Sequence, residues 1–566
     1  MNCPVSCPVV AVLLLLAGSA PAQSPSAAQP SSAVRPLAPA QPPSAAQPSS
    51  PAQSPSAVLE PSGLPGPLVI VGGGPIPADA RQAFVELAGL HRAKIVVIPT
   101  ASIDADDPQK AGEFLKPWQE LKPGPQPGSV VLLHTRDPKT ANDPEFVRPR
   151  TVATGVWFSG GDQGRITAAY RGTLVEKELK KLHERGGVIG GTSAGASVLS
   201  DLMITGGGDT ARTGAGLGLL PGFVIDQHFV RRGRVKRLAG LIDANPSYVG
   251  LGIDEATALV VRGRLARVLG DSTVTVCLGK GAGRPATRQE YRAGELLDLL
   301  QLRRAAANRA AAEPFPPARP GEPVVEKGTL VIVGGGRTPP EVMDTFFQKA
   351  GGKDALIVAV PTTAASGPGD VRYLQSFGAR NVKLLHPHDR KQADDPQFSE
   401  PLLKAGGVWF GGGRQWNFVD SYEGTLTEKR FHDVLRRGGV IGGSSAGASI
   451  QGEYMPRGHP LGNTVMAAEG YERGFGFLPG CAIDQHFFAR KRTADMTGLM
   501  KQYPQYLGIG IDEATAVVVT GSVAEVLGRS TVAFYDYSKK PDGDKDYVEL
   551  KAGERYDLKK RAKLEK

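Results

Sequence analysis

The chain is poor in cysteine, with four among its 566 residues. Cys3 and Cys7 precede an apolar run near the N-terminus and do not form a lipoprotein-type cleavage site, so only Cys277 and Cys481 remain for the rest of the chain. Two cysteines cannot build a disulfide framework, although a single bridge between them stays open.

Apolar runs of transmembrane length are also missing. The run from Val9 to Leu16 is too short to span a bilayer, and Ala20-Pro21-Ala22 after it matches a small-x-small cleavage site. Although Met1 to Pro8 lacks the usual Lys or Arg, we expect residues 1–22 to be a secretory signal peptide. The mature protein should then be soluble, secreted or periplasmic, and not inserted in a membrane.

Motifs for metals and nucleic acids are absent as well. The sequence contains neither His-Glu-x-x-His nor paired-cysteine spacing, so we expect no metal and no cofactor. Two triple glycines, Gly72–Gly74 and Gly334–Gly336, lack G-x-G-x-x-G spacing and a P-loop lysine, and are better interpreted as tight turns. The net charge of +10 permits an acidic partner, but no recognition motif indicates nucleic-acid binding.

Most of the chain is an internal duplication. Gly72–Gly74, Ile98–Thr100 and Leu133-His134 return 252 to 262 residues later as Gly334–Gly336, Val360–Thr362 and Leu385-His386. We therefore expect two tandem domains, residues 67–303 and 328–566, which leaves a pseudo-dimer of the domains open. Residues 304–327 should be a linker that begins helical and alanine-rich and becomes proline-rich. Residues 23–66, rich in Pro, Ala, Ser and Gln, should be a disordered spacer.

Each copy alternates apolar runs with helical stretches. The predicted strands of the first copy are Leu68–Val71, Lys94–Pro99, Ser129–Leu133, Gly155–Phe158, Gly187–Gly190 and Ala256–Val261, and predicted helices include Ala78–Leu90 and Pro340–Ala350. Strands that are apolar on both faces are typical of a parallel sheet covered by helices on both sides. We predict an α/β fold of two tandem doubly wound domains, which bind ligands at the C-terminal ends of their strands.

Each copy also carries a G-x-S-x-G sequence between an apolar run and a predicted helix. Ser193 lies in the first and Ser445 in the second. A serine on such a strand-to-helix turn adopts strained backbone angles, which small neighbours allow. Its Oγ then lies beside backbone N–H groups that can stabilise an oxyanion. Two copies in matching surroundings predict two nucleophile elbows.

A serine hydroxyl needs a base within hydrogen-bond reach. Of nine histidines, only the pairs His134/His386 and His228/His486 recur in both copies. The first pair enters loops of different sequence, whereas the second lies in identical Ile-Asp-Gln-His-Phe blocks. The second pair is therefore favoured as the base.

The base in turn needs a group that orients it, and a carboxylate is expected. Asp226 and Asp484 lie two residues before the histidines, where a contact would be strained. Glu255 and Glu513, each in a Gly-Ile-Asp-Glu-Ala-Thr-Ala segment ahead of a predicted strand, are favoured. The resulting order Ser…His…Glu differs from that of α/β-hydrolases and indicates another family.

Together these motifs resemble the cyanophycinase group of the S51 serine peptidases, and the resemblance covers both copies. It implies a flavodoxin-like or class I glutamine-amidotransferase-like fold. It also implies two Ser-His-Glu triads: Ser193, His228, Glu255 and Ser445, His486, Glu513. The implied oxyanion donors come from the elbow and from a Gly-Gly-x-Gln loop: Ala194 and Gly161 in the first copy, Ala446 and Gly413 in the second.

The same resemblance implies a substrate. Cyanophycin has a poly-aspartate backbone with arginine on each side chain, and the group cuts it to β-Asp-Arg dipeptides. Guanidinium groups beside a triad suit the capture of carboxylates. The implied substrate residues are Gln163, Asp226, Gln227, Arg232, Arg234 and Arg237 in the first copy and Gln415, Asp484, Gln485, Arg490 and Arg492 in the second.

The second copy departs from this pattern in two ways. Asp495 stands where the first copy has Arg237, and Ser445 precedes His486 by 41 residues, against 35 in the first copy. The extra residues, around Arg457 to Tyr471, could reshape or cover the cleft. We expect retained chemistry with altered affinity or specificity, or a domain that mainly holds the polymer.

The expected function is therefore an exported serine-type exopeptidase that hydrolyses cyanophycin through an acyl-enzyme. Its partner would be an acidic or zwitterionic aspartyl polymer or peptide. Two alternatives stay open: an S51 aspartyl dipeptidase acting on short Asp-X peptides, and a polymer-binding protein with one or both sites inactive.

Overall fold

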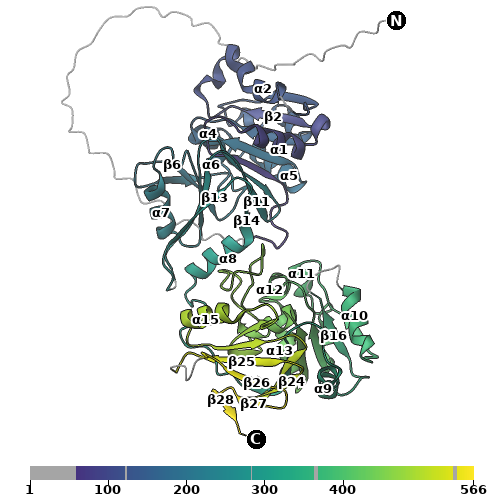
Figure 1. Ribbon diagram of the computed structural model, residues 1–566. Helices are drawn as coiled ribbons and strands as arrows, with labels where there is room; N and C mark the ends of the chain where they lie inside the picture. The colour runs from purple at the N-terminus through teal and green to yellow at the C-terminus, as the bar shows by residue number, and fades with distance from the viewer. Residues whose placement is uncertain (1–58, 122–123, 282, 362–366, 540–544, 566) are drawn as a thin grey trace, which may run out of the picture.

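The computed structural model describes residues 59–121, 124–281, 283–361, 367–539 and 545–565. The chain forms two lobes, one from each copy, with helix α8 (Leu299–Ala310) lying between them (Figure 1). The predicted signal peptide and most of the predicted spacer lie outside the described residues. The end of that spacer is described: Leu59 and Leu64 are buried in the core of the first domain, so residues 59–66 belong to that domain.

The main sheet of the first domain has eight strands in the order β14-β11-β10-β1-β5-β4-β2-β3. The five strands from β1 to β3 in this order pair in parallel, as predicted. The other three extend the sheet in antiparallel pairs. The predicted strand over 256–261 is β10, and it runs antiparallel to both of its neighbours, β1 and β11. It turns directly back into β11, and so short a connection joins only antiparallel strands. The strands are β14 (Leu296–Asp298), β11 (Leu265–Gly270), β10 (Thr257–Arg262), β1 (Leu68–Val71), β5 (Val188–Thr192), β4 (Gly155–Phe158), β2 (Lys94–Ile98) and β3 (Ser129–Leu132).

Helices cover both faces of this sheet, which makes the domain doubly wound. Because side chains alternate along a strand, Val69 and Val71 of β1 face one helical layer, and Leu68 and Ile70 face the other. The first layer contains α1 (Ala78–Ala88) and α2 (Ala111–Gln119), and the second contains α3 (Pro144–Thr151), α4 (Gln163–Tyr170), α5 (Leu174–Glu184) and α6 (Ala194–Ser197).

A second, smaller sheet was not predicted from the sequence. Its strand order is β13-β12-β9-β8, and β8 and β9 run parallel, connected through α7 (Val235–Ala244). The residues that follow β8 and β9 hydrogen-bond to the turn after β1, so the ends of these two strands meet the C-terminal edge of the main sheet. The strands are β8 (Phe223–Gln227), β9 (Val249–Ile253), β12 (Thr273–Leu278) and β13 (Thr287–Arg292), and a separate hairpin joins β6 (Leu202–Gly206) to β7 (Arg212–Ala215).

The second domain repeats this plan with two sheets and helices on both faces. The main sheet runs β17 (Val382–Leu384), β16 (Ile357–Val360), β18 (Gly407–Phe410), β19 (Val440–Ser444), β15 (Val325–Val333), β23 (Thr515–Gly521), β24 (Val523–Gly528), β27 (Arg555–Asp557) and β28 (Ala562–Leu564). The smaller sheet runs β20 (Gly452–Tyr454), β21 (Leu478–Gln485), β22 (Leu507–Ile511), β25 (Thr531–Asp536) and β26 (Val548–Lys551). The helices are α9 (Pro340–Ala350), α10 (Gly367–Ser376), α11 (Arg390–Ala393), α12 (Trp416–Tyr422), α13 (Leu426–Arg436), α14 (Ala446–Ser449) and α15 (Thr493–Gln502).

The segment between the copies packs against both of them. Ala305 and Ala306 of α8 are buried in the core of the first domain, while Phe315 stacks on Tyr454 of the second. Four arginines of the first domain and of α8 also form ion pairs with carboxylates of the second domain. These interdomain pairs are Arg264–Asp420, Arg284–Glu472, Arg304–Glu423 and Arg309–Glu469.

Cys277 and Cys481 are both buried and unpaired, so the single bridge left open by the sequence is not present. Burial raises the pKa of the Cys277 thiol to about 11. Among the described residues, no helix combines the length and the hydropathy that a membrane crossing requires.

Candidate active site

Ser193 and Ser445 lie on the sharp turns that the sequence predicts. Ser193 joins β5 to α6 with φ 54° and ψ −112°, and Ser445 joins β19 to α14 with φ 57° and ψ −111°. A residue other than glycine rarely adopts such angles, and they persist only where the surrounding structure fixes them. Gly195 provides the space, since a Cβ there would lie 2.7 Å from the carbonyl carbon of Phe158.

Each serine begins a chain of hydrogen bonds. Ser193 Oγ lies 2.8 Å from His228 Nε2, and His228 Nδ1 lies 2.6 Å from Glu255 Oε1. In the second domain, the corresponding distances are 2.9 Å from Ser445 to His486 and 2.6 Å from His486 to Glu513. The serine comes from the main sheet, whereas the histidine and glutamate follow β8 and β9, or β21 and β22, of the smaller sheet.

The alternative histidine and carboxylate of the first copy, His134 and Asp226, have partners other than the triad residues. His134 hydrogen-bonds to Thr100 Oγ1 at 2.9 Å and to Asp106 Oδ1 at 2.8 Å, so its ring is held in a separate polar cluster. Asp226 pairs with Arg237 rather than with the imidazole of His228.

The triple-glycine turn belongs to the site, which the sequence reasoning missed. The carbonyl oxygen of Gly72 accepts the N–H of His228 at 2.7 Å, and that of Gly73 accepts the N–H of Ala256 at 2.9 Å. A Cβ on Gly73 would lie 2.6 Å from Nε2 of His228. The turn therefore holds the backbones on either side of the His228–Glu255 pair and leaves room for the imidazole.

Asp254 is a second residue that was missed. Its carboxylate accepts the N–H of Arg231 at 2.9 Å and the hydroxyl of Ser272 at 2.8 Å, so it anchors the loop that carries His228. Asp512 makes the same kind of contact with the N–H of Phe488 at 3.0 Å. Both aspartates stand directly before the paired glutamate in the repeated Gly-Ile-Asp-Glu-Ala-Thr-Ala segments, which was the available signal.

The predicted oxyanion donors border the serines. Ala194 and Ala446 are the first residues of α6 and α14, where a backbone N–H has no acceptor within its own helix. Gly160 and Gly161 form the neighbouring loop, and a Cβ on Gly160 would lie 3.4 Å from the Cβ of Ser193. Gly161 and its counterpart Gly413 have φ of 139° and 130°, values that favour glycine.

A cavity of about 340 Å³ opens beside Ser193. Arg232 is exposed at this cavity, whereas Arg234 donates through Nη1 to the carbonyl of Gln227 at 2.6 Å. Arg237 is buried and binds Asp226 with two nitrogens. Burial raises the pKa of Asp226, and the guanidinium of Arg237 opposes this effect. The lining residues are Gly161, Gln163, Ser193, Ile204, Thr205, Gly206, Gln227, Arg232, Arg234 and Arg237.

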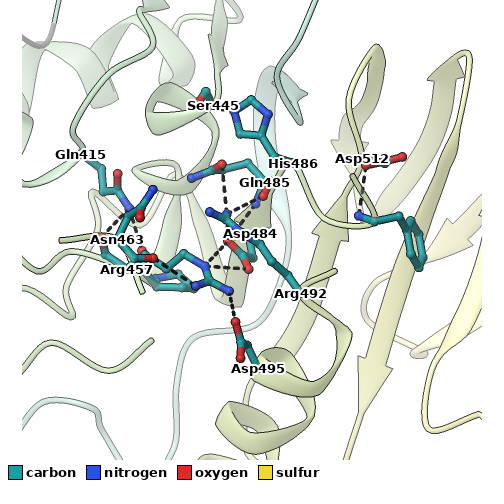
Figure 2. Close-up of polar contacts among 12 residues, drawn as sticks. Gln415, Ser445, Arg457, Asn463, Asp484, Gln485, His486, Arg492, Asp495 and Asp512 are labelled. Atoms are coloured by element: carbon teal, nitrogen blue, oxygen red, sulfur yellow. Dashed lines mark hydrogen bonds and ion pairs between the residues drawn. The ribbon is translucent and has the colours of Figure 1, made fainter. Parts of the chain in front are cut away.

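In the second domain, Arg490 is exposed and Arg492 is buried. Arg492 Nη1 donates to Asp484 Oδ1 at 2.9 Å and to the carbonyl of Gln485 at 2.6 Å. Arg457 of the insertion also donates to Asp484, which stands two residues before His486 in the chain (Figure 2). The insertion thus contributes a side chain to the site, which the sequence did not indicate.

The two amides of the Gly-Gly-x-Gln loops are oriented by the segments after the elbows. Gln163 Nε2 donates to the carbonyl of Ile204 at 2.7 Å, and Gln415 Nε2 donates to that of Pro456 at 2.9 Å.

Burial lowers the pKa of His486, and its hydrogen bond to Glu513 only partly offsets this effect. In the described part of the chain, no group of three or more His, Cys, Asp or Glu side chains could hold a metal ion.

The model of peptidase family S51 matches residues 68–269 and 330–527, more than half of the chain. The chain belongs to this family. It carries two S51 domains in tandem, and the membership makes it a hydrolase of the serine peptidase type.

Cyanophycinases are among the curated proteins that match this chain. That of Geminocystis herdmanii is 32% identical over 221 residues, which are 37% of this chain and 81% of the relative. That of Nostoc sp. is 31% identical over 228 residues, 38% of this chain and 75% of the relative. A crystal structure of a peptidase from an acI-B1 Actinobacterium covers 42% of this chain and 98% of that protein, at 25% identity and a TM-score of 0.35.

Proposed function

We propose that this S51 protein is an exported serine exopeptidase that hydrolyses cyanophycin to β-Asp-Arg dipeptides. The observation that carries the proposal is the hydrogen-bonded Ser193–His228–Glu255 chain at the mouth of an arginine-lined cavity. The hydrogen-bonded series Ser445–His486–Glu513 repeats this arrangement, so the proposal includes two sites on one polypeptide.

The geometry supports acyl transfer through a covalent intermediate. Glu255 accepts a hydrogen bond from the Nδ1–H of His228, which leaves Nε2 free to take the proton of Ser193 as Oγ attacks the peptide carbonyl. The N–H groups of Ala194 and Gly161 would stabilise the oxyanion that forms. His228 then gives its proton to the leaving amine, and water hydrolyses the acyl-enzyme with His228 again as the base.

Three features support cyanophycin as the substrate. Arg232 and Arg234 place positive charge at the cavity, which suits the free carboxylates of the arginine branches and of the chain end of cyanophycin. A cavity of about 340 Å³ has the size of a small-ligand site, which fits the release of short units. Cyanophycinases are also among the relatives that match this chain.

The test is dipeptide release from cyanophycin by the mature protein and by Ser193→Ala, Ser445→Ala and the double variant. We expect each single variant to keep activity and the double variant to lose it. Poly-aspartate and short Asp-X peptides serve as comparison substrates. Cleavage of Asp-X peptides without release from cyanophycin would contradict the proposal and favour a dipeptidase, and binding without any cleavage would favour a polymer-binding protein.

A further inference from the structure

The insertion of the second copy places an arginine where the first copy uses Arg237. Arg237 is the third residue of α7, and its Nε donates to Asp226 Oδ2 at 2.9 Å. The third residue of α15 is Asp495, which cannot make this contact. Arg457 makes it instead, with Nε at 3.1 Å from both oxygens of Asp484 (Figure 2).

Arg457 reaches Asp484 from a different part of the chain. It stands twelve residues after Ser445, as Thr205 stands twelve residues after Ser193. Its Nη2 donates to Asp495 Oδ2 at 2.6 Å and its Nη1 donates to the carbonyl of Asn463 at 3.1 Å. Asp495, which stands at the position of Arg237 in the first copy, therefore holds the Arg457 guanidinium in place.

The backbone of Arg457 is also constrained. Its φ is 60°, a left-handed value that few non-glycine residues adopt. The side chain is 3% exposed and the Asp484 carboxylate is 0% exposed. Two carboxylates and one carbonyl hold the guanidinium, which accounts for the persistence of this conformation.

Two groups of the second site, Gln415 and Arg492, are linked to Arg457. Its carbonyl accepts the amide of Gln415 at 2.8 Å. Its guanidinium shares Asp484 with Arg492. Without Arg457, Asp484 would keep Arg492 as its guanidinium partner but would lose the second guanidinium that fixes the position of its carboxylate. Loss of the Arg457 side chain would thus disturb Arg492, while Gln415 would keep its bonds to the backbone carbonyls of Arg457 and Pro456.

We propose that Arg457 is a positioning residue of the second site that replaces Arg237, and that Arg457 and Asp495 form an exchanged pair. The catalytic part of this inference rests on the proposed function. Asp495 has a side chain that is 47% exposed and adds a negative charge that the first site lacks. The second site should therefore bind the carboxylates of the substrate more weakly than the first.

The test uses the full chain with Ser193→Ala, so that only the second site acts. We expect Arg457→Ala to lower kcat/KM at least tenfold, mainly through KM, and Arg457→Lys to recover part of the loss. The paired exchange Arg457→Thr with Asp495→Arg recreates the residues of the first copy, and it should restore kcat/KM to within about threefold of the parent, unlike either single change. Lys501→Ala, an exposed cation on α15, is the matched control.

Thermal unfolding of the same variants separates positioning from stability. An unchanged kcat/KM in Arg457→Ala, or an exchange that restores thermal stability but not KM, would overturn the inference. A Ser193→Ala parent without activity would instead contradict the proposed function of the second site. In that case, Arg237→Asp in a Ser445→Ala chain should impair the first site and Thr205→Arg should repair it, and failure to repair would again overturn the inference.

Discussion

Gly73 lies against the imidazole of His228, so closely that a Cβ on this glycine would come within 2.6 Å of Nε2. Gly335 has the same relationship to His486. The position is also strained for other residues, since φ is 120° at Gly73 and 117° at Gly335.

Gly73→Ala in a Ser445→Ala chain should therefore displace His228 and lower kcat at least a hundredfold, with the fold retained. The measurement is single-site dipeptide release together with circular dichroism. Gly240→Ala on α7 is the control, because nothing lies within 4 Å of its added Cβ. A Gly73→Ala protein with normal kcat would show that the imidazole can move without loss.

The Glu255 carboxylate, which follows β9, should contribute to catalysis through its negative charge. Glu255→Gln keeps the size of the side chain but no longer stabilises an imidazolium or fixes the reactive tautomer, so kcat should fall by about a thousandfold in a Ser445→Ala chain. Glu290→Gln, an exposed change on β13, should have no effect. Comparable losses in kcat and kcat/KM would indicate a transition-state role, whereas a loss confined to KM would contradict it.

The second site should remain active in mild acid. A general base must be neutral to accept a proton, so activity falls as the pH drops through its pKa. Burial lowers the pKa of His486, which moves this acidic limb to lower pH. In a Ser193→Ala chain, the limb of the kcat/KM profile should have its midpoint below 6.5, the ordinary histidine value. A midpoint above 6.5 would contradict this reading of the site.

His183 should make the stability of the first domain sensitive to pH. Both of its ring nitrogens are buried without a hydrogen-bond partner, and burial lowers its pKa to about 4. Between pH 6.5 and 4 the unfolded chain takes up a proton that the folded domain does not, so stability falls as the pH falls through this window. The loss at pH 5 should be about 2 kcal/mol.

His183→Leu should remove most of this dependence, because Leu435 occupies the corresponding position in the second copy. The measurement is hydrogen exchange of core amides in α5 and β5 at pH 7 and pH 5. The exposed residue His91 provides the control variant His91→Leu. Equal pH dependence in the wild-type and His183→Leu proteins would contradict the prediction.

The sequence predicts the elbows and their partners because these residues are repeated. His228 and Glu255 lie in blocks that return almost unchanged, and short-range patterns also locate helices such as Pro340–Ala350, which is α9. The smaller sheet escaped prediction because β8 and β9 read as apolar runs like those of the main sheet, and nothing local separates the two.

Arg457 escaped prediction for a different reason. Its partners Asp484 and Asp495 lie 27 and 38 residues further along the chain, and the segment between Ser445 and His486 that contains Arg457 is longer than its counterpart in the first copy. A comparison of aligned positions registers only that Asp495 has replaced an arginine. The compensating residue becomes visible only when the folded chain brings the three side chains together.

In the four interdomain ion pairs, every guanidinium comes from the first domain or from α8, and every carboxylate comes from the second domain. Without this division of charge, a domain could pair as well with a second copy of itself as with the other domain. Here, a first domain facing another first domain across this surface would bring arginines together, and two second domains would bring carboxylates together. Like-charge contacts of this kind select against wrong partners. The charges at this surface therefore favour contact of a first domain with a second domain over contact between two like domains.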